Sequence, residues 1–173
     1  MEIGFDLIGD LNLGPEDSFN WEGKSTSLYC LVAGNVSEDL KTVVQTLAHL
    51  SRFYQGVFYV PGLLEYKTAL THAVRTKELS LLIKKLPKVA FLYHHVVIID
   101  GIAVVGCNAW NADNPDDIDD ELVSDRLEDI AYLNNSVQRL QTHGDVKRIL
   151  VVTACVPRRE LYFGKIPSHT EDH

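Results

Sequence analysis

The chain has 173 residues, a length that suits one domain with a substantial buried core. Its 24 acidic residues outnumber its 16 Lys and Arg residues, and the net charge of −8 argues against a nucleic acid as the main partner. No apolar run is long enough to span a bilayer and the N-terminus lacks a secretory-signal profile, so we expect a cytoplasmic protein without a membrane partner.

The first third of the chain alternates apolar segments with short turns that contain Gly, Asn or Pro. Apolar segments of this length, bounded by such turns, are typical of buried strands. The segments and the turns that follow them are residues 2–8 with Gly9-Asp10-Leu11-Asn12, residues 27–33 with Gly34-Asn35, and residues 56–60 with Pro61-Gly62-Leu63-Leu64-Glu65.

Two helices are expected in the first half of the chain. Residues 38–50 place apolar side chains at helical spacing, and Ser37 precedes them as the expected N-cap. A second helix is predicted over about residues 64–85, where Pro87 ends it. Its inward-facing residues are expected to be Leu79, Leu82 and Ile83.

A hairpin and a long helix are predicted in the second half. Asp100-Gly101 is a strong two-residue hairpin turn between the apolar residues 96–99 and 102–107. Residues 108–120 are acidic and contain Pro, so we expect a surface loop there. A helix over about residues 119–143 then leads to a last strand at residues 148–152. Apolar residues near helical spacing in that helix are Leu122, Leu127, Ile130, Leu133, Val137 and Leu140.

This order of elements predicts the α/β class, with helices between near-continuous apolar strands and a sheet covered on both faces. We expect a single domain over residues 1–165 and a loosely held polar tail at residues 166–173. The three cysteines form no C-x-x-C pair and lie in or just after apolar strands, which indicates free thiols. They are Cys30, Cys107 and Cys155.

The turns after the strands resemble those of the calcineurin-like metallophosphoesterases, whose strands end in D-x-H, G-D, G-N-H-[DE] and T-H-x-x-P. Here the turns read D-x-N, G-N, G-L-L-E and T-A-C-V-P, and Gly106 to Trp110 matches a G-x-x-x-W segment. The resemblance covers about residues 2–160. It implies a β-sandwich flanked by helices, with a site for two metal ions at the carboxyl ends of the strands.

Most of the implied metal ligands are substituted. The resemblance places Asp10 at the first aspartate, Asn12 at a histidine ligand, Asn35 at the bridging aspartate, Leu63 at an asparagine ligand, Leu64 at the histidine acid, Glu65 at a structural acid and Ala154 at another histidine ligand. The family's G-H-x-H motif is absent, because Ser168-His169 is a poor substitute, so we expect a fold truncated at its C-terminus. A neutral amide at position 35 cannot balance two dications.

The resulting hypothesis is a pseudoenzyme without catalytic residues, metal or cofactor. We expect it to serve as a binding or structural component, with a protein partner or further copies of itself, for example in a virus particle or a multiprotein complex. The alternative is a metal-dependent phosphoesterase with a rebuilt mononuclear site, in which Asp10, Asn12 and Asn35 act with His94 or Glu65. A third reading is that a partner covers the truncated edge of the sheet.

Several residues outside these turns have competing interpretations. His94-His95 is expected in a turn between strands, because neighbouring strand side chains point to opposite faces. Trp21 and Trp110 are candidates for partner contacts or core anchors. Asp10 is expected to stabilise its turn through hydrogen bonds to nearby amides. Other candidates are Cys155 as a nucleophile, beside which the sequence alone places no His or Asn, and Arg158-Arg159, His169 and His173 as incidental ligand contacts.

Overall fold

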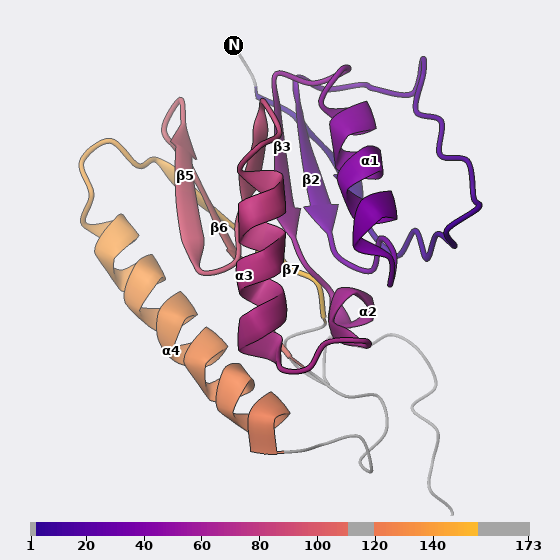
Figure 1. Ribbon diagram of the computed structural model, residues 1–173. Helices are drawn as coiled ribbons and strands as arrows, with labels where there is room; N and C mark the ends of the chain where they lie inside the picture. The colour runs from indigo at the N-terminus through magenta and orange to yellow at the C-terminus, as the bar shows by residue number, and fades with distance from the viewer. Residues whose placement is uncertain (1–2, 111–119, 156–173) are drawn as a thin grey trace, which may run out of the picture.

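The computed structural model describes residues 3–110 and 120–155, and their strands form two sheets (Figure 1). The first sheet is parallel, with the strands in chain order from β1 to β4. In the second sheet, β6 pairs antiparallel with β5 and parallel with β7. The strands are β1 (Phe5–Ile8), β2 (Tyr29–Ala33), β3 (Gly56–Val60), β4 (Val89–Phe91), β5 (His95–Ile99), β6 (Ile102–Cys107) and β7 (Arg148–Thr153).

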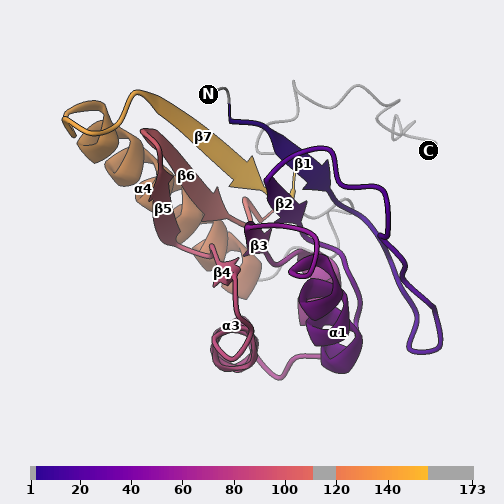
Figure 2. The same ribbon diagram turned by 90° about the horizontal axis from the view of Figure 1, so that it is seen from above.

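Helices cover the outer faces of both sheets. Figure 2 shows α1 and α3 beside the first sheet, the second sheet behind it and α4 on the far side. The helices are α1 (Leu40–Leu50), α2 (Leu63–Tyr66), α3 (His72–Ile83) and α4 (Asp120–Gln141). The α/β class predicted from the sequence is therefore confirmed, and both faces of the parallel sheet are covered.

The alternation of side chains along each strand explains these layers. In β2, Cys30 and Val32 pack toward the helices, whereas Leu31 belongs to the core between the two sheets. In β6, Val104 packs into that same core and its neighbours pack against α4. Because successive strand residues point to opposite faces, fully apolar strands are required to bury both sides.

The helix predicted over residues 64–85 is wrong in its extent. It is two helices, α2 and α3, and α3 has its own N-cap in Thr71, whose side chain accepts a hydrogen bond from the Val74 amide. The predicted N-cap Ser37 is also wrong. Asp39 caps α1 by accepting from the Thr42 amide at 2.9 Å.

The Asp100-Gly101 hairpin is confirmed. Both residues have positive φ, 47° and 83°, as the favoured two-residue turn requires. The surface loop expected from residue 108 is wrong at its start, because Asn108 and Trp110 are fully buried. Residues 111–119 lie outside the described residues.

The long helix α4 matches its predicted range within two residues, but its apolar residues do not all face inward. Leu122 and Leu140 are buried, whereas Leu127 and Ile130 are exposed.

Within the described part of the chain, no helix combines the length and the apolar character needed to cross a membrane. The expected polar tail, residues 166–173, and the candidates Arg158-Arg159, Ser168-His169 and His173 lie outside the described residues.

Candidate functional site

The turns singled out in the sequence meet at one end of the sandwich. Figure 1 shows the arrows of β2 and β3 pointing toward the end at which α2 lies. The Asp10 amide donates to the Gly34 carbonyl at 3.2 Å, and the Asn12 amide donates to the Asn35 carbonyl at 2.9 Å. The turn after β1 is therefore held along the turn after β2, at the edge where ligands collect in open α/β sheets.

Two glycines allow the other turns to approach. Gly34 has a φ of 68°, and a Cβ placed on it would lie 2.6 Å from both the Gly62 Cα and the Ala154 Cβ. A Cβ on Gly62 would lie 2.5 Å from the Asn35 amide nitrogen. The turns after β2 and β3 therefore approach each other through their backbones, with the Ala154 side chain after β7 beside them, and a side chain at position 34 or 62 would force them apart.

The Asn35 amide group joins three of these turns. Its Nδ2 donates to the Asp10 carboxylate at 2.7 Å, and its Oδ1 accepts from the Leu64 amide at 3.0 Å. These two bonds fix which end of the amide faces Asp10, because a carboxylate accepts only and a backbone amide donates only. Asp10, Asn12 and Asn35 all have φ values near 50°, a conformation that Asn and Asp tolerate better than most residues.

Asp10 does form the hydrogen bond expected of it, but its partner is a side-chain amide rather than a backbone amide. The Asn12 side chain turns back onto the Asp10 carbonyl at 3.0 Å. Both residues are exposed to solvent. The polar groups at the surface of this edge therefore bind one another.

Glu65 lies beneath this surface and is fully buried. Its carboxylate accepts from the backbone amides of Val36, Gly62 and Asn35 at 2.7, 2.8 and 3.1 Å. Burial raises the pKa of Glu65, although the backbone hydrogen bonds from Val36 and Gly62 act in the opposite direction. The bond from Gly62 also satisfies the amide that precedes α2. Glu65 therefore ties the turn after β2 to the turn after β3.

The remaining residues that the resemblance singled out line the same edge as apolar groups. Leu63 and Leu64 open α2, and Ala154 follows β7 beside Gly34. All three are half-buried. The structure thus brings together all seven residues of the expected remnant site.

Asn108 is a further residue of this region that the sequence analysis missed. Its Nδ2 donates to the Pro61 carbonyl at 2.8 Å, and the Cys155 thiol and amide both bond to it, at 3.2 and 2.9 Å. Asn108 therefore connects the ends of β3, β6 and β7. The sequence feature that could have identified Asn108 is its position in the Gly106 to Trp110 segment.

The donor set does not fit a pair of metal ions. Asn35, which the resemblance places at the bridging position, presents an N–H to Asp10, and a positively polarised donor repels a cation. Within residues 3–110 and 120–155, no group of three or more His, Cys, Asp and Glu side chains is arranged to hold a metal ion. The residues around Asp10 do not match the carboxylate and imidazole set that the resemblance implies.

The histidines of the central region are bonded to α4. His94 lies in the turn before β5 as predicted, but the prediction of a turn is wrong for His95, which is the first residue of β5. His94 approaches the buried Asp129 carboxylate at 2.5 Å, and Asp129 also accepts from the Ala109 amide at 2.6 Å. The His72 Nδ1 lies 2.6 Å from the Asp125 Oδ2. The His72 ring stacks on the Trp110 ring, with the ring centroids 4.4 Å apart. These contacts join α4 to α3 and to the segments that precede β5 and follow β6.

Both tryptophans pack in or against the hydrophobic core. Trp110 is fully buried. Trp21 is half-buried, packs against the same core and donates from its indole to the Tyr54 hydroxyl at 2.6 Å. Neither is a freely exposed aromatic contact, so the core-anchor interpretation holds for both.

Comparisons with known proteins find a similarity in fold. No protein-family model matches the chain, and no curated protein matches it. A crystal structure of phosphopantetheinyl hydrolase (PptH) from Mycobacterium tuberculosis is similar, with a TM-score of 0.54 and 17% identity over 86% of this chain and 67% of that chain. At this identity the similarity describes the fold alone.

Proposed function

We propose that this chain is a degenerate relative of the calcineurin-like metallophosphoesterases that acts as a binding or structural component and not as a hydrolase. Three features support the proposal. The turns with family-like patterns meet at the carboxyl ends of the strands, the fold is similar to that of a hydrolase, and, apart from Asp10, the residues at the ligand positions are amides and apolar groups.

One observation carries this proposal, namely the orientation of the Asn35 amide. Its oxygen is occupied by the Leu64 amide, and its N–H groups face the Asp10 carboxylate. Binding a cation between Asp10 and Asn35 would require breaking both hydrogen bonds and reversing the amide. The edge is therefore stabilised by its own hydrogen bonds in the place where two positive charges would otherwise hold it together.

The alternative, a mononuclear hydrolase, has less support. Its proposed extra donors were Glu65 and His94. Both Glu65 oxygens accept from buried backbone amides, and His94 is paired with Asp129. Moving Glu65 to a metal would leave three buried amides without acceptors, at a cost of about 1–3 kcal/mol for each.

The test combines elemental analysis of the purified protein with hydrolysis of bis-p-nitrophenyl phosphate in the presence of Mn²⁺. We expect neither stoichiometric metal nor turnover above that of an Asp10→Ala variant. Stoichiometric metal together with hydrolysis that Asp10→Ala abolishes would overturn the proposal. The Glu128→Ala variant, which changes an exposed carboxylate on α4, controls for any general effect of losing one negative charge.

A surface on α4 supports the binding role. Val123, Leu127 and Ile130 recur at i, i+4 and i+7 and are exposed by 45%, 62% and 48%. This spacing forms an apolar stripe along one side of the helix, which is the pattern of a helix that packs against another surface. We propose this stripe as the contact surface for a second copy of the chain.

Light scattering at increasing protein concentration tests this contact. We expect the wild type to exceed the mass of one chain and the Leu127→Glu variant to remain a monomer, because the new charge cannot be buried at the contact. Asn135→Glu, an exposed change on a different side of α4, is the matched control and should associate like the wild type. A wild type that stays monomeric at high concentration would contradict the proposed contact.

A further inference from the structure

A concave site lies at the opposite end of the sandwich from the Asp10 edge. It is an open cavity of about 340 Å³ between the two sheets, where β2, β3 and β4 begin. Tyr29 and Gly56 are the first residues of β2 and β3, so this cavity and the candidate site occupy the two ends of the same strands. The cavity is within the range of volumes that hold small ligands.

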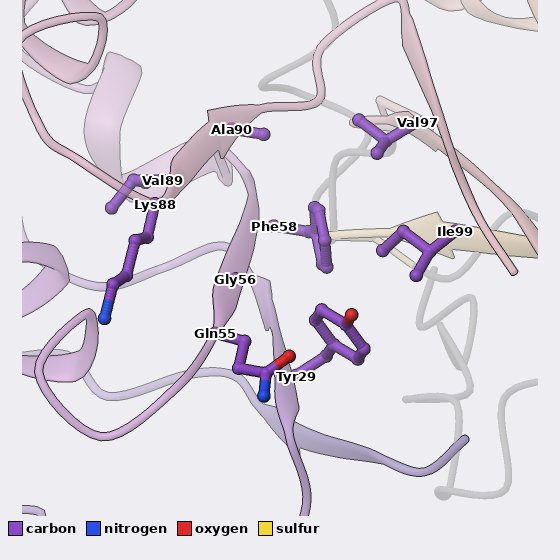
Figure 3. Close-up of a pocket in the computed structure, with 9 residues that line it drawn as sticks. All are labelled: Tyr29, Gln55, Gly56, Phe58, Lys88, Val89, Ala90, Val97 and Ile99. Carbon is purple, nitrogen blue, oxygen red and sulfur yellow. The ribbon is translucent and has the colours of Figure 1, made fainter. Parts of the chain in front are cut away.

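The walls of the cavity are aromatic on one side and aliphatic on the other. Figure 3 shows Tyr29 and Phe58 from the first sheet turned toward Val97 and Ile99 from β5. The Tyr29 and Phe58 ring centroids are 6.0 Å apart and tilted by 39°, and Phe5 packs on both rings. Tyr29, Val97 and Ile99 are only half-buried, so part of the apolar space between the sheets is open to water.

Glycine at position 56 keeps the aromatic wall in place. A Cβ on Gly56 would lie 3.1 Å from Phe58 Cζ and 3.3 Å from Tyr29 Cδ1. These contacts are tighter than ordinary packing allows, so the two rings lie over a stretch of backbone that only glycine leaves free. An occupant of the cavity therefore meets ring faces and edges, which favour stacked or tilted contacts with another ring.

The cavity offers hydrogen bonds but no charge. The Lys88 side chain extends away from the space that Phe58 and Ile99 face (Figure 3), and its Nζ lies 3.5 Å from the Tyr54 carbonyl. The polar side-chain groups of the lining that remain are the Gln55 amide and the Tyr29 hydroxyl. A charged occupant would lose hydration here without gaining an opposite charge.

We propose that this cavity is a binding site for a small uncharged molecule that carries an aromatic or similarly flat apolar ring and one hydrogen-bonding group. The ring packs between the Tyr29–Phe58 wall and the Val97–Ile99 wall, and the polar group reaches the Gln55 amide at the mouth. This inference is independent of the proposed function, because it uses none of the residues around Asp10.

Titration with N-phenyl-1-naphthylamine, an uncharged probe whose fluorescence rises in apolar sites, tests the proposal. We expect saturable binding of one equivalent to the wild type, with changes in the amide NMR signals of Gln55 and Gly56. Ile99→Trp fills the cavity and should weaken binding at least about tenfold. The matched control is Ile98→Trp on the same strand, because Ile98 is exposed and points to the other face of β5.

A second filling variant, Ala90→Leu, covers the case in which Ile99→Trp does not fold, and thermal unfolding verifies each variant. Competition between 1-naphthol and 1-naphthoate tests the preference for uncharged ligands, and we expect naphthol to displace the probe at lower concentration. The proposal is overturned if the wild type binds no probe, if the two Trp variants bind it equally, or if naphthoate competes as well as naphthol. Equal loss in both Trp variants would identify the signal as general surface adsorption.

Discussion

The two ends of the sandwich differ in what lies between their strands. At the carboxyl end the strands finish in turns that touch one another, and their polar groups are satisfied by Asn35 and Glu65. At the amino end the sheets leave an apolar cavity lined by Tyr29, Phe58 and Ile99. The polar groups at the carboxyl end therefore bond to one another, and the open apolar surface lies at the other end.

The largest expected effect is at Glu65. Glu65→Ala removes the acceptor of three backbone amides in a fully buried position, so we expect the free energy of unfolding to fall by about 3 kcal/mol or more. Urea denaturation followed by circular dichroism measures this loss. A change below about 1 kcal/mol would mean that the carboxyl end does not depend on Glu65, and the comparison between the two ends would fail.

The contact between the turns is tested by a pair of glycines. Gly34 and Gly23 have similar φ values, 68° and 72°, but a Cβ on Gly34 meets Ala154 and Gly62 at 2.6 Å, whereas a Cβ on Gly23 meets nothing within 4 Å. We expect Gly23→Ala to cost about 1 kcal/mol for its backbone alone. Gly34→Ala should cost about 2–3 kcal/mol, because steric overlap adds to the backbone cost. Equal thermal shifts in the two variants would show that the turn after β2 does not touch the turns after β3 and β7.

A smaller effect is expected at Asp6, on the β1 edge of the first sheet. Burial raises the pKa of Asp6, but hydrogen bonds from Thr26, Tyr54 and Ser27 outweigh it and hold the pKa well below its usual value. A carboxyl with a lowered folded pKa stabilises the protein above its unfolded pKa, near 4, and this stability is lost as the pH falls toward the folded value.

We therefore expect Asp6→Asn to cost about 1–2 kcal/mol at pH 6, because hydrogen bonds to a charged acceptor are weakened. The difference from the wild type should shrink steadily below about pH 4. Urea denaturation at several pH values measures it. A difference that stays constant with pH would show that the Asp6 charge does not contribute.

The comparison between the ends also shows what the sequence could predict. The strands, the Asp100-Gly101 hairpin and the residues of the carboxyl-end turns follow from apolar segments and turn residues, which are local signals. The break between α2 and α3 was missed, because residues 67–71 include helix-forming types and the Thr71 cap is visible only once the chain turns. The direction of the Asn35 amide depends on partners 25 and 29 residues away.

The cavity could not be predicted at all. Tyr29, Phe58, Val97 and Ile99 read as ordinary core residues in the sequence, and only the spacing of the two sheets leaves them half-exposed or lining open space. The sequence also did not predict which apolar residues of α4 are exposed. Helical spacing identified Leu127 and Ile130 as apolar positions, but which side of the helix faces the sheet is decided by Asp129 and its bonds to His94 and Ala109.

The central claim is that the carboxyl end is closed by the Asn35 hydrogen bonds and has no place for paired cations. Calorimetric titration of Mn²⁺ into the wild type and into Asn35→Asp tests it most directly. The account predicts no stoichiometric binding to the wild type, and a gain of binding in Asn35→Asp, which places a second carboxylate beside Asp10. Uptake of two equivalents of Mn²⁺ by the wild type would contradict it.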